Sequence, residues 1–278
     1  LTGKLTVFEM APLRFTHALV SRVSSSYKSL GEADYEEAKR QHESYVRVLR
    51  DTGLDVIELP PDDALPQCVF IEDTAVVCNG IALMARPKDD KRLKEVETVR
   101  AVLKKELELP IIEITEEQAS LEGGDVLFTG QEFFVGLSDF TNEAGARAVA
   151  SAFPEFPCTP IKVPEKYHLK AFVTMAGPDI LCVSAGKPSQ DVIKRIEREA
   201  TFTYQTLTVP EDTAANVIYC NGTLIHRSAD DTPLSAKVFS ERIDFSRKSV
   251  SVSELSKHSS GLSSCVLLVR RSRHIRSL

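Results

Sequence analysis

The chain has 278 residues, of which 42% are hydrophobic and 27% charged, and its formal net charge is −6. This length suits one large domain or two average ones, with enough apolar residues for a soluble globular core. The acidic balance gives no reason to expect nucleic-acid binding, but it is compatible with a cationic ligand. Because no apolar stretch approaches the roughly 18 residues of a membrane span and no secretory leader pattern is present, we expect a cytoplasmic protein without membrane contact.

Amphipathic helical patterns recur five times, starting 45 to 56 residues apart near Tyr35, Lys91, Thr141, Pro188 and Pro233. Each is followed by a short alternating strand, at 56–60, 111–115, 160–164, 206–210 and 249–253. After a loop comes an apolar strand, in the order "TAVVC", "DVLFT", "AFVTMA", "NVIYC" and "CVLLV". Four of these units then show another strand, at "IALMA", "EFFVGL", "DILCVS" and "TLIHR".

The strand that the fifth unit lacks is supplied by "THALV", residues 16–20, at the other end of the chain. A unit split between the two termini closes a ring and removes the exposed edge of an open array. We therefore predict one α/β domain, residues 1–278, built as a five-bladed pseudo-symmetric α/β propeller. Residues 1–14 and 270–278 are expected to be terminal extensions, the second a solvated basic tail.

Conspicuous polar side chains lie in the loop before the apolar strand of every unit: Glu72 and Asp73, then Glu122, His168, Asn216 and Cys265. Equivalent positions around a pseudo-symmetric ring converge near its axis. We therefore expect these scattered residues to form one constellation.

Each of these residues also has a structural interpretation when it is taken alone. "CVFIEDTAVVC", residues 68–78, is typical of a buried strand, and its two acids could be accommodated by a bend at Ile71 or by an arginine. "EGGD" is typical of a turn in which glycine takes a positive φ. His168 alone is compatible with a satisfied core or surface histidine, and Asn216 with an amide that bonds the backbone of a turn.

The six cysteines, at 68, 78, 158, 182, 220 and 265, are spread along the chain without CxxC pairs. This spacing predicts neither disulfides nor a structural zinc site. Buried packing is the first interpretation for a cysteine in an apolar strand, and this includes Cys265 when it is considered alone.

Taken together, the loop residues indicate chemistry on a guanidinium group. A cysteine supplies a nucleophile once ionised, a histidine moves protons, and a glutamate such as Glu122 orients the imidazole. Paired carboxylates such as Glu72 and Asp73 match the donors of a guanidinium, whose central carbon is a poor electrophile until it is held over a thiolate.

These segments resemble the dimethylarginine dimethylaminohydrolases, in the superfamily of guanidino-modifying enzymes that includes arginine deiminase and the amidinotransferases. The resemblance runs from "RFTHALV" through "LPQCVFIEDTAVVC", "LEGGDVLFTGQEFFVGLS" and "HLKAFVTMAGP" to "SELSKHSSGLSSCVLL". It implies the five-bladed pentein fold, and hydrolysis of Nω-methylated arginine to citrulline and a methylamine in arginine metabolism and nitric oxide regulation. It implies no metal and no organic cofactor.

The resemblance also implies roles for individual residues. Cys265 would attack the guanidinium carbon and form a covalent thiouronium, His168 would protonate the departing amine and then assist water, and Glu122 would support His168. The small-molecule substrate would be bound by Gln67, Phe70, Glu72, Asp73 and Arg92. Because nearby carboxylates hinder thiol ionisation, we expect the cationic substrate and protonated His168 to lower the pKa of Cys265 in the complex.

Three positions depart from the family pattern. Gln67 replaces an aspartate, Phe140 stands where animal members carry an arginine that contacts the substrate carboxylate, and Ala171 replaces a serine. Arg92 matches the other carboxylate-contacting arginine. Two alternatives therefore stay open: hydrolysis of another arginine-derived guanidine, or a catalytically weakened relative that acts as a binding protein. In each case we expect a monomer or homodimer.

Residues 22–34, "RVSSSYKSLGEAD", form a serine-rich connection between a strand and a helix. They are compatible with an active-site lid and equally with an ordinary surface loop.

Overall fold

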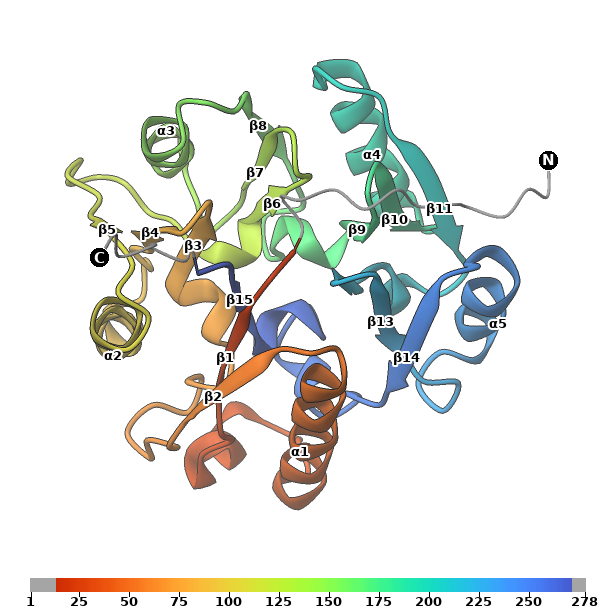
Figure 1. The fold of residues 1–278 in the computed structure, drawn as a ribbon, viewed down its shortest axis with the longest axis horizontal. Helices are drawn as coiled ribbons and strands as arrows, with labels where there is room; N and C mark the ends of the chain where they lie inside the picture. The colour runs from red at the N-terminus through yellow and green to blue at the C-terminus, as the bar shows by residue number, and fades with distance from the viewer. Residues whose placement is uncertain (1–13, 272–278) are drawn as a thin grey trace, which may run out of the picture.

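The structure is a computed structural model that describes residues 14–271. Five three-stranded sheets surround a central axis, and five helices lie on the outside of this ring (Figure 1). The predicted α/β propeller of five units is therefore confirmed. The predicted terminal extensions lie almost wholly outside the described residues.

Every unit has the same strand topology. Its inner strand runs antiparallel to a middle strand, and the middle strand runs parallel to an outer strand after a crossover helix. The inner strands are β3 (Ala75–Cys78), β6 (Val126–Phe128), β9 (Val173–Gly177), β12 (Ile218–Cys220) and β15 (Leu267–Val269). The middle strands are β4 (Ile81–Met84), β7 (Phe133–Leu137), β10 (Ile180–Ser184), β13 (Thr223–Arg227) and β1 (His17–Ser21). The outer strands are β5 (Ile111–Ile112), β8 (Cys158–Lys162), β11 (Gln205–Val209), β14 (Ser246–Val250) and β2 (Asp55–Leu59).

The fifth sheet joins the two ends of the described chain. β1 pairs antiparallel with β15, His17 opposite Val269, and parallel with β2, His17 opposite Asp55. In Figure 1 the dark red β1 accordingly lies beside the dark blue β15. The prediction that "THALV" completes the last unit is confirmed, and the ring has no open edge at this junction.

The helices are α1 (Tyr35–Asp51), α2 (Leu93–Lys105), α3 (Glu143–Ala152), α4 (Lys187–Glu199) and α5 (Pro233–Arg242). Local chemistry explains the limits of α1: the carboxylate of Asp34 accepts a hydrogen bond from the backbone N–H of Glu37, and Gly53 just after the helix has φ +81°. Tyr45 and Leu49 on its inner face are fully buried. All five predicted helices are present, within a few residues of their expected starts.

Two predicted outer strands differ from the structure in their bounds. The outer strand of the fifth unit is β14, Ser246–Val250, not 249–253, because its register follows residue-by-residue pairing with β13. β5 contains two residues instead of the five expected at 111–115. The strand predicted at "TAVVC" is present as Ala75–Cys78, and residues 71–74 before it form a 3-10 turn, so only the last part of the apolar run 68–78 is a strand.

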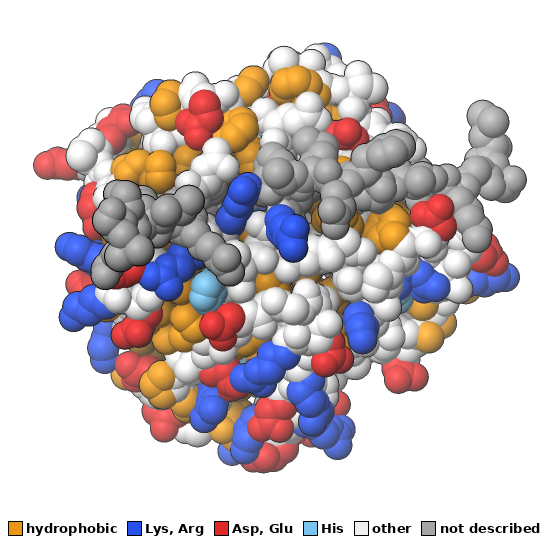
Figure 2. All heavy atoms as spheres, in the orientation of Figure 1, with side chains coloured by type: hydrophobic (Ala, Val, Ile, Leu, Met, Phe, Trp, Pro, Cys, Tyr) orange, Lys and Arg blue, Asp and Glu red, His pale blue; other side chains and the backbone are white. Residues whose placement is uncertain are grey.

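The outer surface carries both signs of charge. On the face shown in Figure 2, basic and acidic side chains are interspersed around the atoms drawn in grey. None of the helices in the described part of the chain combines the length and the apolar character that crossing a bilayer requires.

Candidate active site

Short 3-10 turns precede the inner strands and meet around the axis. η3 packs against η5 and η9, and η6 packs against η5 and η7. These turns are η3 (Ile71–Thr74), η5 (Gly123–Asp125), η6 (Leu169–Ala171), η7 (Asp212–Ala215) and η9 (Ser263–Cys265). The six loop residues singled out in the sequence lie in these turns or directly beside them, so their predicted convergence is confirmed.

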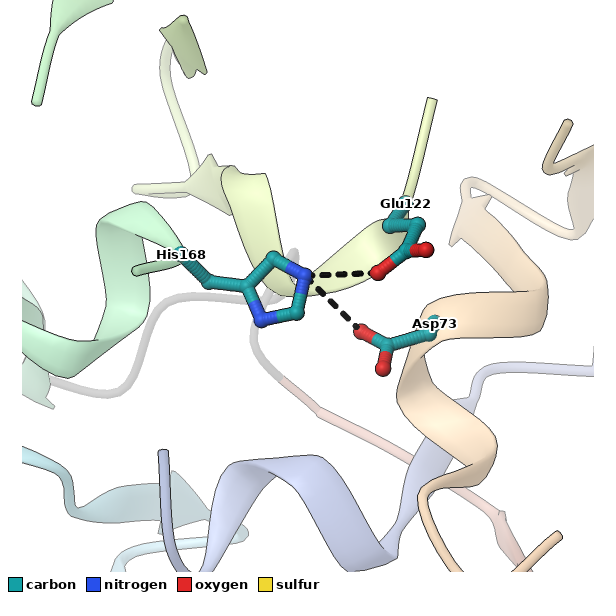
Figure 3. A group of neighbouring side chains, drawn as sticks. All are labelled: Asp73, Glu122 and His168. Atoms are coloured by element: carbon teal, nitrogen blue, oxygen red, sulfur yellow. Dashed lines mark hydrogen bonds and ion pairs between the residues drawn. The ribbon is translucent and has the colours of Figure 1, made fainter. Parts of the chain in front are cut away.

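The imidazole of His168 faces two carboxylates from neighbouring units (Figure 3). Its Nε2 lies 2.7 Å from Oε2 of Glu122 and 3.7 Å from Oδ1 of Asp73. Burial alone lowers the pKa of His168, but Asp73, the hydrogen bond to Glu122 and the charge of Asp125 outweigh it and raise the pKa to about 9. The ring is therefore an imidazolium at neutral pH, and its Nε2–H donates to Glu122.

Asp125 is a positioning group that the sequence interpretation did not assign. Its Oδ1 accepts a hydrogen bond from the backbone N–H of Leu169 at 2.9 Å, and its Oδ2 accepts one from the Ser138 hydroxyl at 2.7 Å. Burial raises the pKa of Asp125 to about 6, against the opposing charge of His168. The carboxylate thus holds the turn that directly follows His168. The feature of the sequence that could have identified Asp125 is its position at the end of "EGGD", directly before an apolar strand.

The two glycines of "EGGD" are required for space, not for a positive φ. Neither belongs to the glycines with positive φ, so the turn type assumed from the sequence is wrong here. A Cβ on Gly123 would lie 2.0 Å from the carbonyl oxygen of Glu72, and one on Gly124 would lie 2.8 Å from Cγ of His168 and 2.9 Å from Oδ1 of Asp73. The units approach each other so closely that no side chain fits between them.

Replacing Gly124 with alanine should push His168 and Asp73 apart. We expect kcat to fall by more than about tenfold and the free energy of unfolding to fall by about 1–3 kcal/mol, the usual cost of overpacking. Steady-state kinetics and urea unfolding measure the two effects. Gly53→Ala is the control, because it adds the same methyl group at a strained φ with nothing within 4 Å. Its kcat should be unchanged, and an unchanged kcat for Gly124→Ala would contradict the geometry.

Arg92 is shared among the acids of the site. Its Nη1 donates to Asp73 at 2.8 Å, its Nε and Nη2 donate to Glu95 at 3.0 and 2.8 Å, and Nη2 also donates to the carbonyl of Phe70 at 3.1 Å. Glu122 lies 3.7 Å from Nη1. Burial raises the pKa of Asp73, but His168 and Arg92 outweigh it and hold that pKa below its usual value. Glu95, three residues after Arg92 on one helix face, escaped the sequence interpretation.

Glu72 points to the other side of the same turn. Its Oε1 accepts from Nζ of Lys170 at 2.5 Å, and its Oε2 accepts from the Ser263 hydroxyl at 3.0 Å. Burial raises the pKa of Glu72 and Lys170 opposes that shift. The chain bends at Ile71, but the bend turns neither acid to water, because both carboxylates stay buried. The expected arginine meets Asp73 only, and a lysine meets Glu72.

Asn216 links two units. Its Oδ1 accepts from the backbone N–H of Ser263 at 2.9 Å, and its Nδ2 donates to the Ser263 hydroxyl at 2.8 Å and to the carbonyl of Lys170 at 2.9 Å. The structural interpretation of this amide is confirmed. Its contacts hold the turn that ends in Cys265.

Cys265 closes that turn and is fully buried. Burial raises the pKa of its thiol, Glu72 and Asp73 raise it further, and Arg227 opposes them. The thiol is therefore protonated in this arrangement of charges. All six cysteines are free.

A cavity of about 790 Å³ opens onto this group. Of the predicted site residues, it is lined by Gln67, Phe70, Asp73, Arg92, Glu122 and His168, and Ser264 beside Cys265 lines it as well. Glu72 instead lines the apolar channel between the inner strands. Phe140 lies with its ring centroid 4.4 Å from that of His168, at 34° between the planes, where the resemblance places an arginine in animal members.

The segment 22–34 packs against the wall of this cavity. Tyr27 is fully buried and contacts the rings of Phe70 and His258, with centroids 6.1 and 5.7 Å apart, and its hydroxyl donates to the carbonyl of Glu254 at 3.0 Å. Both Phe70 and His258 line the cavity. The segment is thus in contact with the site, and its opening as a lid stays a prediction.

Within the described residues, one group of side chains could supply three ligands to a metal ion: Asp73, Glu122 and His168, whose ligand atoms lie within 4.8 Å of one another. In this structure Nε2 of His168 is hydrogen-bonded to Glu122, and Asp73 lies 3.7 Å from the same nitrogen. The expectation that no metal takes part stays a prediction.

The ring of five units and its axial cluster of cysteine, histidine and carboxylates define a pentein of the guanidino-modifying superfamily. Residues 20–240 match the model of a family described as N,N dimethylarginine dimethylhydrolase, eukaryotic. A Bos taurus protein named putative hydrolase DDAH2 is 36% identical over 276 residues, covering 94% of this chain and 96% of that protein. The chain therefore belongs to the eukaryotic dimethylarginine dimethylhydrolase family, whose members hydrolyse guanidino carbon–nitrogen bonds.

Bacterial relatives agree with this assignment. A Streptomyces coelicolor N(G),N(G)-dimethylarginine dimethylaminohydrolase is 30% identical over 230 residues, covering 82% of this chain and 83% of that protein. The structure of a Pseudomonas aeruginosa dimethylarginine dimethylaminohydrolase mutant complexed with citrulline superposes with a TM-score of 0.75 at 26% identity, covering 92% of this chain and 99% of that one.

Proposed function

We propose that this protein hydrolyses Nω-methylated arginine to citrulline and a methylamine, with Cys265 as nucleophile. The observation that carries the proposal is that the His168–Glu122 pair and Asp73 meet at one cavity, whose wall includes Ser264 in the turn that ends in Cys265. No single segment of the chain brings these groups together, so the ring itself assembles them.

In the proposed mechanism, the Cys265 thiol loses its proton to solvent when the cationic substrate binds, and the resulting Sγ thiolate attacks the guanidinium carbon to form a tetrahedral adduct. His168 then donates its proton to the departing methylamine nitrogen, the carbon–nitrogen bond breaks, and a thiouronium remains on the sulfur. The imidazole, now neutral, accepts a proton from water that attacks the same carbon, and citrulline leaves as the thiol is restored. The raised pKa of His168, about 9, supports its part because the ring carries the proton before the reaction begins.

Charge balance supports a cationic substrate. The buried group contains five carboxylates, from Glu72, Asp73, Glu95, Glu122 and Asp125, and three cations, from Arg92, Lys170 and His168, so its formal charge is 3 − 5 = −2. A guanidinium bound beside Asp73 offsets this excess. It also favours the thiolate of Cys265, whose pKa is raised by burial and by the acids.

Recognition of the amino-acid end of the substrate gives a reason to test a second candidate substrate. Phe140 covers His168 with an apolar ring, Gln67 is neutral, and Arg92 already binds Asp73, Glu95 and the carbonyl of Phe70. A substrate carboxylate would thus meet weaker cationic recognition. Losing one charge-assisted hydrogen bond costs about 1.5–3 kcal/mol, or about ten- to hundredfold in affinity. These contacts favour, as the second candidate, another arginine-derived guanidine with an altered tail.

A panel of guanidines separates the candidates. The protein is incubated with asymmetric dimethylarginine, monomethylarginine, arginine and agmatine, and released amine and ureido product are both quantified. We expect amine and citrulline in equal amounts from the methylated arginines, at the highest kcat/KM of the panel. Faster turnover of agmatine, which lacks the carboxylate, would move the assignment to the second candidate. Binding without release of amine from any member would contradict hydrolysis and leave the binding-protein alternative.

A further inference from the structure

Arg227, at the end of β13, is a buried arginine that the mechanism above does not use. Only 4% of it is exposed, and its Nε and Nη2 have no hydrogen-bond partner among the described residues. The carboxylate of Asp231 lies 4.0 Å from Nη1, which is beyond hydrogen-bond distance. Burial lowers the pKa of Arg227. Keeping such a charge in the interior without a close counter-ion costs several kcal/mol, so the arginine calls for a function.

The guanidinium faces the segment that carries the nucleophile. Nη2 of Arg227 lies 3.1 Å from the point that a Cβ on Gly261 would occupy, and Gly261 has φ +120°. The carbonyl of Gly261 accepts a hydrogen bond from the backbone N–H of Ser264 at 3.2 Å, so this glycine opens the turn that ends in Cys265. Because Gly261 has no side chain, the cation reaches the backbone of that turn.

The other cations near the nucleophile are paired at short distance. Lys170 bonds Glu72, Arg92 bonds Asp73 and Glu95, and His168 bonds Glu122. Arg227 is different because its charge is only loosely matched by Asp231. Neighbouring carboxylates therefore offset the positive charge of Arg227 less than they offset the charges of Lys170, Arg92 and His168. Consistently, Arg227 opposes the acids that raise the pKa of Cys265.

We propose that Arg227 is a positioning residue that stabilises the thiolate of Cys265 from beside the turn of Gly261. It supplies a positive charge that stays in the protein throughout the reaction, whereas the charge brought by the substrate leaves with the product. The inference rests on the proposed function only in taking Cys265 as the nucleophile.

The test measures the reactivity of Cys265 without any turnover. Iodoacetamide is used because it is neutral and adds no charge of its own, and the alkylated Cys265 peptide is quantified by mass spectrometry between pH 6 and 10. We expect Arg227→Met to slow alkylation at pH 8 by about tenfold or more and to move the midpoint of the pH profile upward. Arg227→Lys should restore most of the rate, because it restores the charge.

Asp231→Asn should change the alkylation rate of Cys265 in the opposite direction to Arg227→Met. It removes the negative charge beside Arg227 while an amide can still accept from the backbone N–H of Val252 and meet the Ser251 hydroxyl, which Asp231 bonds at 2.9 and 2.5 Å. Alkylation of Cys265 should become faster and its pH profile should shift downward. This variant keeps Arg227, so it tests the inference even if Arg227→Met does not fold.

Arg242→Met is the matched control, because Arg242 also has a buried Nε without a partner in the described structure but lies on α5. Its alkylation profile should match wild type. The inference is overturned if Arg227→Met and Arg242→Met behave alike, or if Asp231→Asn shifts the profile upward. Neither result bears on whether the protein hydrolyses guanidines. Conversely, if the protein is inactive but the alkylation rate of Cys265 still depends on Arg227, only the proposed function is contradicted.

Discussion

Replacing Cys265 with serine is expected to lower kcat by about 10⁴-fold or more on whichever guanidine the wild type turns over. An alcohol ionises far less readily than a thiol, and the acids and burial that raise the pKa of Cys265 act on a hydroxyl in the same direction. Substrate binding should persist, because the carboxylates that we propose to bind the guanidinium are unchanged. Rapid-quench kinetics and isothermal titration calorimetry separate the two effects.

Cys220→Ser is the matched control for this experiment. Cys220 is also fully buried, and its Sγ lies 3.5 Å from the hydroxyl of Thr52, so a serine finds a hydrogen-bond partner there. Its kcat should stay within about twofold of wild type. Intact-protein mass spectrometry of a quenched reaction should show a covalent adduct in wild type and in Cys220→Ser but not in Cys265→Ser. Turnover that survives Cys265→Ser would remove Cys265 from the chemistry.

The architecture could be predicted from the sequence because it repeats. Each unit has too small an apolar face to fold alone, so its pattern of helix and strands had to recur until the ring closed. The split unit followed from the same count: one strand was missing at the end of the chain and one was left over at its start, and β1 pairs with β15 as expected. Strand boundaries were less accurate because backbone pairing, not side-chain alternation, sets them, as β14 demonstrates.

Which polar groups converge could be predicted, and so could the pairing of Glu122 with His168, but the partners of Glu72 and Asp73 could not. Loop position within each unit brought Glu122 to His168, whereas the direction in which adjacent side chains point depends on the 3-10 turn at 71–74. Asp73 therefore faces the cavity and Glu72 faces Lys170, although the two acids are neighbours in the chain. Arg227 escaped notice because nothing in "TLIHR" distinguishes a buried arginine from an arginine at the surface.

Arg92→Met is expected to lower the free energy of unfolding by about 3–5 kcal/mol at pH 7, because it leaves buried carboxylates without their cation. In wild type the pKa of Asp73 lies below its usual value, so Asp73 stabilises the fold above that usual value and loses this effect as the pH falls through its folded pKa. Burial already raises the pKa of Glu95 and Glu122 in wild type, and Arg92 opposes both shifts. Without Arg92 these two pKa values rise further and that of Asp73 rises as well, so the folded protein binds protons that the unfolded chain releases. The difference between wild type and variant should therefore be largest near neutral pH and shrink as the pH falls towards about 4.

The control is Arg100→Met on the same helix, where Arg100 pairs at 2.7 Å with Glu113, a residue whose side chain is 52% exposed. A surface pair of this kind contributes about 0–1 kcal/mol, so its removal should change the free energy of unfolding little at any pH. Urea unfolding of the three proteins at pH 4.5, 6 and 7.5 provides the comparison. If the deficit of Arg92→Met instead grew on acidification, or equalled that of Arg100→Met, Arg92 would not be the cation that holds the acids of the site together. Another group would then have to position the carboxylates that we propose to bind the substrate guanidinium.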